Sequence, residues 1–180
     1  MQAVLFDMDG TLVETESLWH EAEVLTMAAF GSTWSEDEQR FALGGPFGRV
    51  VEYMAQKAGA DPTDVAVTLI DAIDQLMSSR PLPIQPGIAE LKAEAEAAGI
   101  PTGLVTNSFR RLISIVLKST GLHFDVTVAG DELAENKPHP LPYEFACESL
   151  GVDPAHTVVL EDSMTGIASA AAAGCFVVAI

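Results

Sequence analysis

Carboxylates, a hydroxyl and an ammonium group follow short apolar runs at four places in this 180-residue chain. A carboxylate held against phosphorus can attack it and form an acyl phosphate, and a second carboxyl group can protonate the leaving oxygen and later activate water. Clustered carboxylates repel one another, which predicts a bound cation, and hard oxygen ligands favour magnesium. Magnesium and a lysine together can neutralise a phosphoryl group. The residues with these properties are Asp7, Asp9 and Thr11; Thr106, Asn107 and Ser108; Lys137; and Glu161 and Asp162.

Each of these four groups has an ordinary structural explanation when it is taken alone. Asp-x-Asp-Gly is typical of a turn, Thr-Asn-Ser of a helix cap, a loop lysine of the solvated surface, and a Glu-Asp pair of the acidic start of a helix. None of these explanations predicts that all four groups lie at the same edge of one sheet. Ligands of open parallel sheets bind at the carboxyl ends of the strands, so we favour a joint site there.

The segments that separate the four groups alternate between short apolar runs and helical patterns. This alternation predicts a parallel sheet with helices on both faces. The expected strands are 3–6, 102–105, 124–129, 157–160 and 176–180, and the expected helices between the later strands are 88–98, 110–119, 142–150 and 165–173.

A block with helical patterns only interrupts this alternation after the first strand. The first of its helices, 16–30, is expected to bury a stripe of Leu18, Ala22, Leu25 and Ala29, and a capping box at 35–38 opens the second. Further helices are expected at 47–58 and 62–79, before a proline-rich linker. The predicted fold is therefore α/β, an open Rossmann-like parallel sheet from residues 1–13 and 86–180 with an inserted all-helical cap domain at residues 14–85.

The composition narrows the class of function. The net charge of −17 comes from 26 acidic and 9 basic residues, which argues against nucleic acid and anionic lipid as partners. No window approaches the roughly 18 uninterrupted apolar residues of a membrane span, and the first residues do not form a signal peptide. We therefore expect a cytoplasmic protein. Cys147 and Cys175 lie in apolar, alanine-rich surroundings and are expected to be buried free thiols.

Together, the four groups resemble the motifs of the haloacid dehalogenase superfamily, in the family's order and across the whole chain. The first motif, Asp-x-Asp-Gly-Thr after a strand, is present at 7–11. The second is a Thr or Ser after an apolar strand, here Thr106, and the third is a lysine before proline, here Lys137. The fourth is an acidic pair in an apolar context, here 161–162. The helical block is similar to the cap of the branch that contains sugar-phosphate phosphatases and β-phosphoglucomutase.

The resemblance implies a role for each motif residue. Asp7 would be the nucleophile and Asp9 the acid/base, and the cap would close over the site and select the substrate. Magnesium would be held by the Asp7 side chain, the Asp9 backbone carbonyl, Glu161 and Asp162. The transferring phosphoryl group would be bound by Asp7, Thr106, Lys137 and the backbone near Asn107.

The cap departs from the mutase-like pattern in its first helix. Trp19 stands where mutase-like members carry a histidine, and His20 lies about 100° further around the helix. Since indole is neither an acid nor a base near neutral pH, this change favours transfer of the phosphoryl group to water. The cap residues expected to contact substrate are Trp19, His20, Phe47 and Arg49.

We therefore expect a magnesium-dependent phosphatase that acts on a small phosphomonoester, such as a sugar phosphate. Two alternatives stay open: a phosphomutase of the β-phosphoglucomutase type, and a non-catalytic module that binds a phosphorylated ligand. Relatives usually continue beyond the strand at 176–180, which would lie near a sheet edge with little sequence to cover it. The expected state is a monomer or a weak homo-oligomer.

Overall fold

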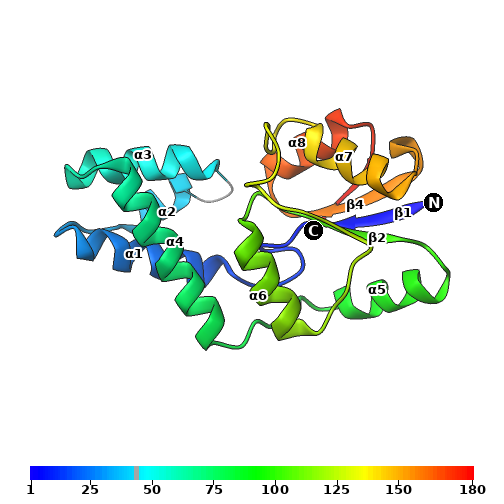
Figure 1. Ribbon diagram of the computed structural model, residues 1–180, viewed down its shortest axis with the longest axis horizontal. Coiled ribbons are helices and arrows are strands. Elements are labelled where there is room, and N and C mark those ends of the chain that lie inside the picture. The colour runs from blue at the N-terminus through cyan, green and yellow to red at the C-terminus, as the bar shows by residue number, and fades with distance from the viewer. Residues whose placement is uncertain (43–44) are drawn as a thin grey trace. The chain divides into compact units, whose positions relative to one another are not determined.

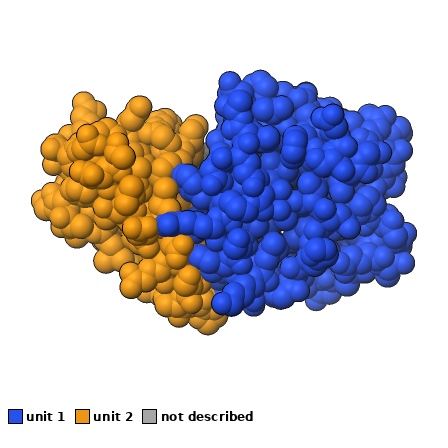
Figure 2. Space-filling model, viewed as in Figure 1, with its two compact units in different colours: residues 1–14, 82–180 blue, residues 15–81 orange. Residues whose placement is uncertain are grey.

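The computed structural model describes residues 1–42 and 45–180, and it divides into two compact units (Figure 2). One unit consists of residues 1–14 and 82–180, and the other of residues 15–81. The all-helical unit begins and ends close to the predicted cap boundaries. The residues at its edges, Glu14 and 82–85, belong instead to the unit that contains the sheet.

Backbone pairing explains why the returning linker belongs to the sheet unit. Val13 and Ile84 form an antiparallel bridge, and the Gln85 N–H donates to the Leu12 carbonyl at 2.9 Å. The Glu14 N–H donates to the Pro83 carbonyl at 3.2 Å. The segment that leaves the sheet unit and the segment that returns to it therefore satisfy each other's backbone hydrogen-bonding groups. The prolines of the linker predict that it is not helical, but they do not predict this pairing.

The core unit contains a five-stranded parallel sheet with the order β3-β2-β1-β4-β5 (Figure 1). Its central strand β1 pairs with β2 on one side and with β4 on the other. The strand order therefore reverses beside β1, which is the position where open α/β sheets bind ligands. The strands span Ala3–Phe6 (β1), Thr102–Val105 (β2), Val126–Val128 (β3), Thr157–Glu161 (β4) and Phe176–Ala179 (β5).

Helices cover both faces of this sheet, as predicted. Helices α5 and α6 lie on one face, and α7 and α8 lie on the other (Figure 1). Right-handed crossovers require this arrangement, because the chain moves outward from β1 to β3 and then returns to β4 and β5. The helices span Ile88–Ala97 (α5), Arg110–Thr120 (α6), Leu141–Leu150 (α7) and Met164–Ala172 (α8), with a 3₁₀ turn at Pro154–His156.

All four residues of β1 are buried, because the strand is central and covered on both faces. Leu5 packs in a cluster with residues of β2, β4 and α7, including Val105, Val159 and Tyr143. Phe6, the next residue along the strand, contacts the ring of Phe124 with centroids 5.8 Å apart. A continuous apolar run is typical of such a doubly covered parallel strand.

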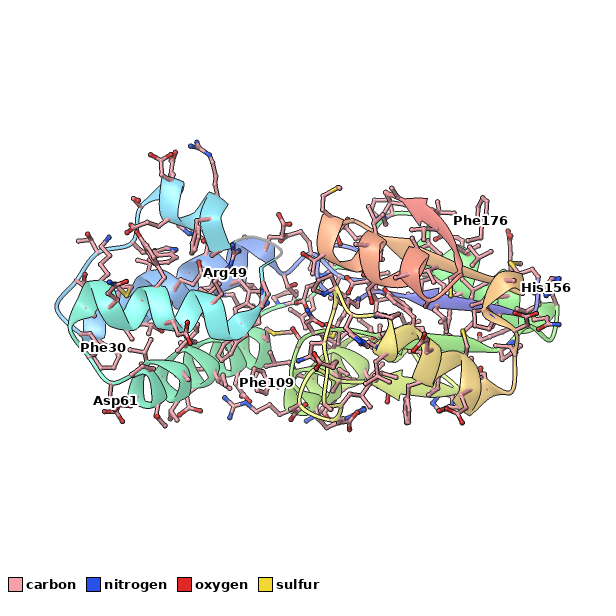
Figure 3. The ribbon with its side chains drawn as sticks, turned by 90° about the horizontal axis from the view of Figure 1, so that it is seen from above. Phe30, Arg49, Asp61, Phe109, His156 and Phe176 are labelled. Atoms are coloured by element: carbon pink, nitrogen blue, oxygen red, sulfur yellow. The ribbon has the colours of Figure 1, made fainter. Side chains whose placement is uncertain are left out.

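The opposite situation holds at β5, the edge strand next to β4. Its residues Phe176 and Val178 are 66% and 38% exposed. Phe176 and His156 mark the amino-terminal ends of β5 and β4 in Figure 3. The predicted edge position of this strand is confirmed. Both cysteines are free, with Cys147 buried and Cys175 only half-buried.

Within its described residues, the regular secondary structure of the cap unit consists of helices alone. The predicted capping box is present, because the Ser35 N–H donates to Glu38 Oε2 at 2.8 Å and the Glu38 N–H donates to Ser35 Oγ at 3.4 Å. Asp61 caps α4 by accepting the Thr63 N–H at 2.8 Å. The helices span Glu16–Ala29 (α1), Glu36–Ala42 (α2), Phe47–Ala58 (α3) and Pro62–Ser79 (α4).

The predicted buried stripe of α1 is only half right. Leu18 and Ala22 are buried, but Leu25 is 49% exposed and Ala29 is also exposed. The buried face continues instead through Glu23 and Thr26. Both polar side chains are satisfied there, since Trp34 Nε1 donates to Glu23 Oε2 at 2.8 Å and the Thr26 hydroxyl donates to the Ala22 carbonyl at 2.7 Å. No helix in the described parts of the chain is long and apolar enough to cross a membrane.

Candidate active site

Three adjacent strands carry the candidate site at their carboxyl ends. Asp7 directly follows β1, Thr106 directly follows β2, and Glu161 is the last residue of β4. Because β1 lies between β2 and β4, the sheet register brings these side chains to one edge. The fourth group, Lys137, comes from the loop between β3 and α7.

Lys137 is buried at this edge, only 4% exposed, and is not the solvated lysine that its sequence context alone suggests. Its ammonium donates to Asp7 Oδ1 at 2.7 Å, to Glu161 Oε1 at 2.6 Å and to the Val105 carbonyl at 2.8 Å. The three N–H groups of the ammonium thus meet three acceptors. The lysine joins the ends of all three strands.

The negative charge of this site exceeds what the lysine balances. Burial raises the pKa of Asp7 to about 8, and the carboxylates of Glu161 and Asp9 add to this effect, while Lys137 opposes it. Burial by itself lowers the pKa of Lys137, but the Asp7 and Glu161 carboxylates help to hold the pKa well above its usual range. A further cation would therefore be stabilised beside Asp7.

Asp9 lies beside Asp7 but is held by different partners. Its Oδ2 atom accepts a hydrogen bond from the Ser108 hydroxyl at 2.7 Å and from the Thr106 hydroxyl at 3.3 Å. Both donors follow β2, so the second motif contacts the second aspartate directly. Thr106 is 3% exposed and Ser108 is 7% exposed.

Asn107 uses its side chain to fix Lys137. Its Nδ2 donates to the Lys137 carbonyl at 3.1 Å, and its Oδ1 accepts the Lys137 N–H at 3.0 Å. The two loops approach closely at Gly130, where a Cβ atom would lie 2.0 Å from the Asn107 carbonyl oxygen. Since the side-chain amide of Asn107 is hydrogen-bonded to Lys137, a phosphoryl group would contact the backbone of Asn107 and not its side chain.

The acidic pair at the end of β4, Glu161 and Asp162, is approached closely by the first motif and by α8. Asp162 Oδ1 accepts the Thr11 hydroxyl at 3.1 Å. Gly10, in the left-handed region with φ of 87°, lets the first motif pass this carboxylate, since a Cβ would lie 2.2 Å from Asp162 Oδ2. Gly166 has the same function for Glu161, where a Cβ would lie 1.7 Å from Oε1.

Tyr143 is a site residue that the sequence analysis missed. It is fully buried on α7, and its hydroxyl donates to Glu161 Oε1 at 2.7 Å, the same oxygen that Lys137 contacts. The Lys137 Nζ atom also lies 4.9 Å from the centre of the Tyr143 ring. A buried tyrosine requires a hydrogen-bond partner for its hydroxyl, and this requirement was the signal in the sequence that could have indicated a polar contact. The sequence does not say which acceptor it meets.

The donor set fits a magnesium ion. Among the described residues, one acidic group could hold a metal ion: Asp7, Glu161 and Asp162, whose ligand oxygens lie within 4.8 Å of one another. All three donors are carboxylates, which suits a hard divalent cation. The Asp9 carboxylate is directed to Ser108, so the metal role expected for Asp9 would fall to its backbone carbonyl.

The four cap candidates belong to the all-helical unit. His20 and Trp19 are half-buried on α1, and the His20 Nδ1 atom lies 2.8 Å from Gln39 Oε1. Arg49, near the start of α3 (Figure 3), donates to the Phe41 carbonyl at 2.9 Å and lies over the Phe41 ring. Phe47, the first residue of α3, is also half-buried. A role for these residues in substrate contact stays a prediction.

Residues 1–174 match the haloacid dehalogenase-like hydrolase family, a span that includes all four motifs. The chain belongs to this family. The family expected from the motifs is thus confirmed, as is the α/β sheet with its two helical layers.

Several relatives of this chain are named as phosphatases. Protein CbbY of Cereibacter sphaeroides is 35% identical over 188 residues, covering 97% of this chain and 81% of that protein. Hexitol phosphatase B of Escherichia coli is 34% identical over 178 residues, covering 95% and 79%. The crystal structure of a CbbY variant from Rhodobacter sphaeroides with xylulose-(1,5)bisphosphate superposes with a TM-score of 0.87 at 31% identity, covering 98% and 84%. These relationships confirm the prediction of a phosphatase-type hydrolase.

Proposed function

We propose that this chain is a magnesium-dependent phosphatase that hydrolyses a small phosphomonoester through an aspartyl phosphate on Asp7. The observation that supports this most directly is the contact of 2.7 Å between Lys137 Nζ and Asp7 Oδ1 at the end of the central strand. A buried carboxylate beside a buried ammonium, with a second carboxylate nearby, suits nucleophilic attack on an anionic phosphoryl group.

The first chemical step forms the acyl phosphate. An Asp7 carboxylate oxygen attacks phosphorus, the bond from phosphorus to the ester oxygen breaks, and the leaving oxygen takes a proton from the Asp9 carboxyl group. Lys137 exchanges contact with Asp7 for contact with the phosphoryl oxygens, and the Thr106 hydroxyl and nearby backbone N–H groups bind the remaining oxygens. Asp9 ends this step as a carboxylate.

The second step returns the enzyme to its starting state. Asp9 takes a proton from a water molecule, the resulting hydroxide attacks phosphorus, and the bond between phosphorus and Asp7 breaks. Inorganic phosphate leaves, Asp7 is again a carboxylate, and Asp9 again carries the proton. One carboxyl group therefore serves both steps in opposite directions.

Magnesium would be held by the side chains of Asp7, Glu161 and Asp162 and by the Asp9 carbonyl. When bound, it would offset the repulsion between the phosphoryl oxygens and the carboxylates of the site. Glu161 already accepts hydrogen bonds from Lys137, Tyr143 and Ser163. Its carboxylate thus links the metal site to the lysine.

The proposed substrate class is the phosphorylated carbohydrates. One similar protein carries the name hexitol phosphatase, and the structure of another was determined with a pentulose bisphosphate. The acidic surface of this chain, with a net charge of −17, offers no long-range attraction to an anion. Recognition must therefore come from local groups such as Lys137.

A panel of phosphorylated metabolites tests this function by release of inorganic phosphate. We expect turnover of one or more sugar phosphates, and a rate loss of order 10³ for Asp7→Asn, or about 4 kcal/mol of barrier. Rapid quenching of a labelled substrate should place the label on Asp7. Label on another residue, or full activity of Asp7→Asn, would contradict the proposed mechanism.

The phosphomutase alternative differs only in what attacks the acyl phosphate. Supplying a hexose 1-phosphate with a trace of the bisphosphate separates the two functions. Inorganic phosphate should dominate, because Trp19 provides no acid or base at the position of the mutase histidine. Hexose 6-phosphate in clear excess would replace the phosphatase by a mutase and leave the roles of Asp7 and Asp9 unchanged.

A further inference from the structure

We propose that Ser108 is a positioning residue for Asp9, holding the acid/base carboxylate in the orientation that both proton transfers require. This inference rests on the proposed function, because it assumes that Asp9 exchanges protons with the leaving oxygen and with water. It gives a role to Ser108, a member of the second polar group to which the family resemblance assigns none.

The geometry distinguishes Ser108 from its neighbour. The Ser108 hydroxyl lies 2.7 Å from Asp9 Oδ2, whereas the Thr106 hydroxyl lies 3.3 Å from the same atom. The first distance is typical of a strong hydrogen bond between a hydroxyl and a carboxylate, and the second is long. The two residues are 99 positions apart in the chain, so only the fold brings them together.

The backbone holds Ser108 in place on both sides. Its N–H donates to Thr106 Oγ1 at 3.0 Å, and its carbonyl accepts the Gly130 N–H at 2.8 Å. Gly130 lies so close to the β2–α6 loop that no side chain could be added there without a clash. The hydroxyl therefore projects from a fixed, buried backbone and does not depend on substrate for its position.

This arrangement separates two tasks that one hydroxyl could not perform together. When substrate binds, the Thr106 hydroxyl can turn to a phosphoryl oxygen, because its bond to Asp9 is the weaker one. Ser108 then remains the donor to Asp9. A carboxylate has two rotatable side-chain torsions, and proton transfer requires its oxygen within hydrogen-bond reach of the reacting atom. Restricting that rotation raises the fraction of productive encounters.

The test compares Ser108→Ala and Ser108→Thr in the full chain and in the Asp9→Asn background. Hexose 6-phosphate and p-nitrophenyl phosphate serve as probes. With the sugar phosphate we expect Ser108→Ala to lower kcat about tenfold while KM stays nearly constant, and Ser108→Thr, which keeps the donor, to recover most of it. Ser114→Ala, which removes an exposed hydroxyl of α6, is the matched control.

Formation of the acyl phosphate gives a second readout. A p-nitrophenolate ion leaves without a proton, so the burst with p-nitrophenyl phosphate should be nearly unaffected by Ser108→Ala, while the burst with hexose 6-phosphate should slow. A merely structural role would slow both alike. In the Asp9→Asn background, Ser108→Ala should add no further loss, because the two residues act as one unit.

Three outcomes would overturn the inference: a raised KM at constant kcat, an equal slowing of the burst with both probes, or a full additional loss in the Asp9→Asn background. If Ser108→Ala fails to fold, Ser108→Cys carries the same comparison, because a thiol is a weak donor of similar size. Full activity of Asp9→Asn would instead contradict the proposed function itself. The two failures are therefore distinguishable.

Discussion

Asn107 binds both backbone polar groups of Lys137, accepting its N–H at 3.0 Å and donating to its carbonyl at 3.1 Å. The pair joins the loop after β2 to the loop after β3, 30 residues further along the chain. The position of the lysine ammonium is thus set by an amide side chain that makes no contact with the ammonium itself.

Replacing Asn107 by Ala should displace Lys137 without removing it. Two partly buried hydrogen bonds are lost, so we expect about 2 kcal/mol lower stability and a catalytic efficiency (kcat/KM) that falls by about tenfold or more. Inorganic phosphate should also inhibit the variant more weakly, because the displaced Lys137 ammonium would bind phosphate less well. The control is Asn136→Ala, which removes one exposed bond to the Gly130 carbonyl. Equal inhibition constants in Asn107→Ala and in the unmodified chain would exclude this role.

Tyr143→Phe should also affect Lys137, because the Tyr143 hydroxyl and the Lys137 ammonium donate to the same oxygen of Glu161. The variant removes only the hydroxyl that donates to Glu161 Oε1, and Lys137 then becomes the main donor to that oxygen. We expect about 1–2 kcal/mol lower stability, because a buried acceptor loses one partner, and a several-fold lower kcat. Tyr53→Phe is the control, since its hydroxyl donates to Glu38 at the exposed cap surface. A Tyr143→Phe variant as active and as stable as the unmodified chain would rule out this contribution.

Asp162→Asn should weaken magnesium binding and leave the fold intact. The Thr11 hydroxyl can still donate to the amide oxygen, but one of three clustered carboxylates loses its charge. Calorimetric titration with magnesium alone should show at least a tenfold weaker affinity. Chelator should abolish turnover in the unmodified chain, and added magnesium should restore it. The control Asp64→Asn, exposed on α4, should match the unmodified chain; unchanged affinity in Asp162→Asn would refute the metal assignment.

Glu23 should make the cap less stable as the pH rises. Burial raises its pKa from 4.5 to about 7, although the Trp34 N–H opposes this shift. Below pH 4.5 the carboxyl is protonated whether the chain is folded or unfolded. Between 4.5 and 7 only the unfolded chain ionises, so the free energy of unfolding falls as the pH increases and is then constant above 7.

Glu23→Gln removes this ionisation at nearly constant shape. The variant should resemble the unmodified chain at pH 4.5 and be more stable at pH 8, by an amount of order 2–3 kcal/mol. Thermal unfolding at both values measures the difference, with Glu52→Gln, exposed on α3, as control. The same stability difference at both pH values would contradict the raised pKa.

The exposed edge strand β5 should promote weak self-association. Phe176 and Val178 are exposed on one face of this edge of the sheet. Val178→Lys should reduce any concentration-dependent association seen by sedimentation, because a charge at an edge opposes strand pairing. Phe145→Lys, which changes an exposed phenylalanine on α7, should not. Monomeric behaviour of the unmodified chain at high concentration would dismiss this expectation.

The amino-acid sequence was sufficient to predict the order of strands and helices, the helical insertion and the four motif groups. Hydrophobic periodicity and the glycine and proline residues that begin or end an element are local signals. They predicted the bounds of β2, α3 and α4 correctly. The predicted strand 124–129 was too long, since β3 spans only Val126–Val128. Asp125 accepts the Thr102 N–H with its side-chain carboxylate, and the backbone pairing with β2 begins only at Val126.

Which polar side chains contact one another could be established only from the three-dimensional fold. Periodicity reports where apolar residues recur, but a buried polar residue is stable only if its partner is supplied, and that partner is often far along the chain. Glu23 and Thr26 therefore occupy the buried face of α1, where Leu25 and Ala29 were expected. For the same reason, Tyr143 became visible as a site residue, and Asp9 as the partner of Ser108, only when the strands were placed side by side.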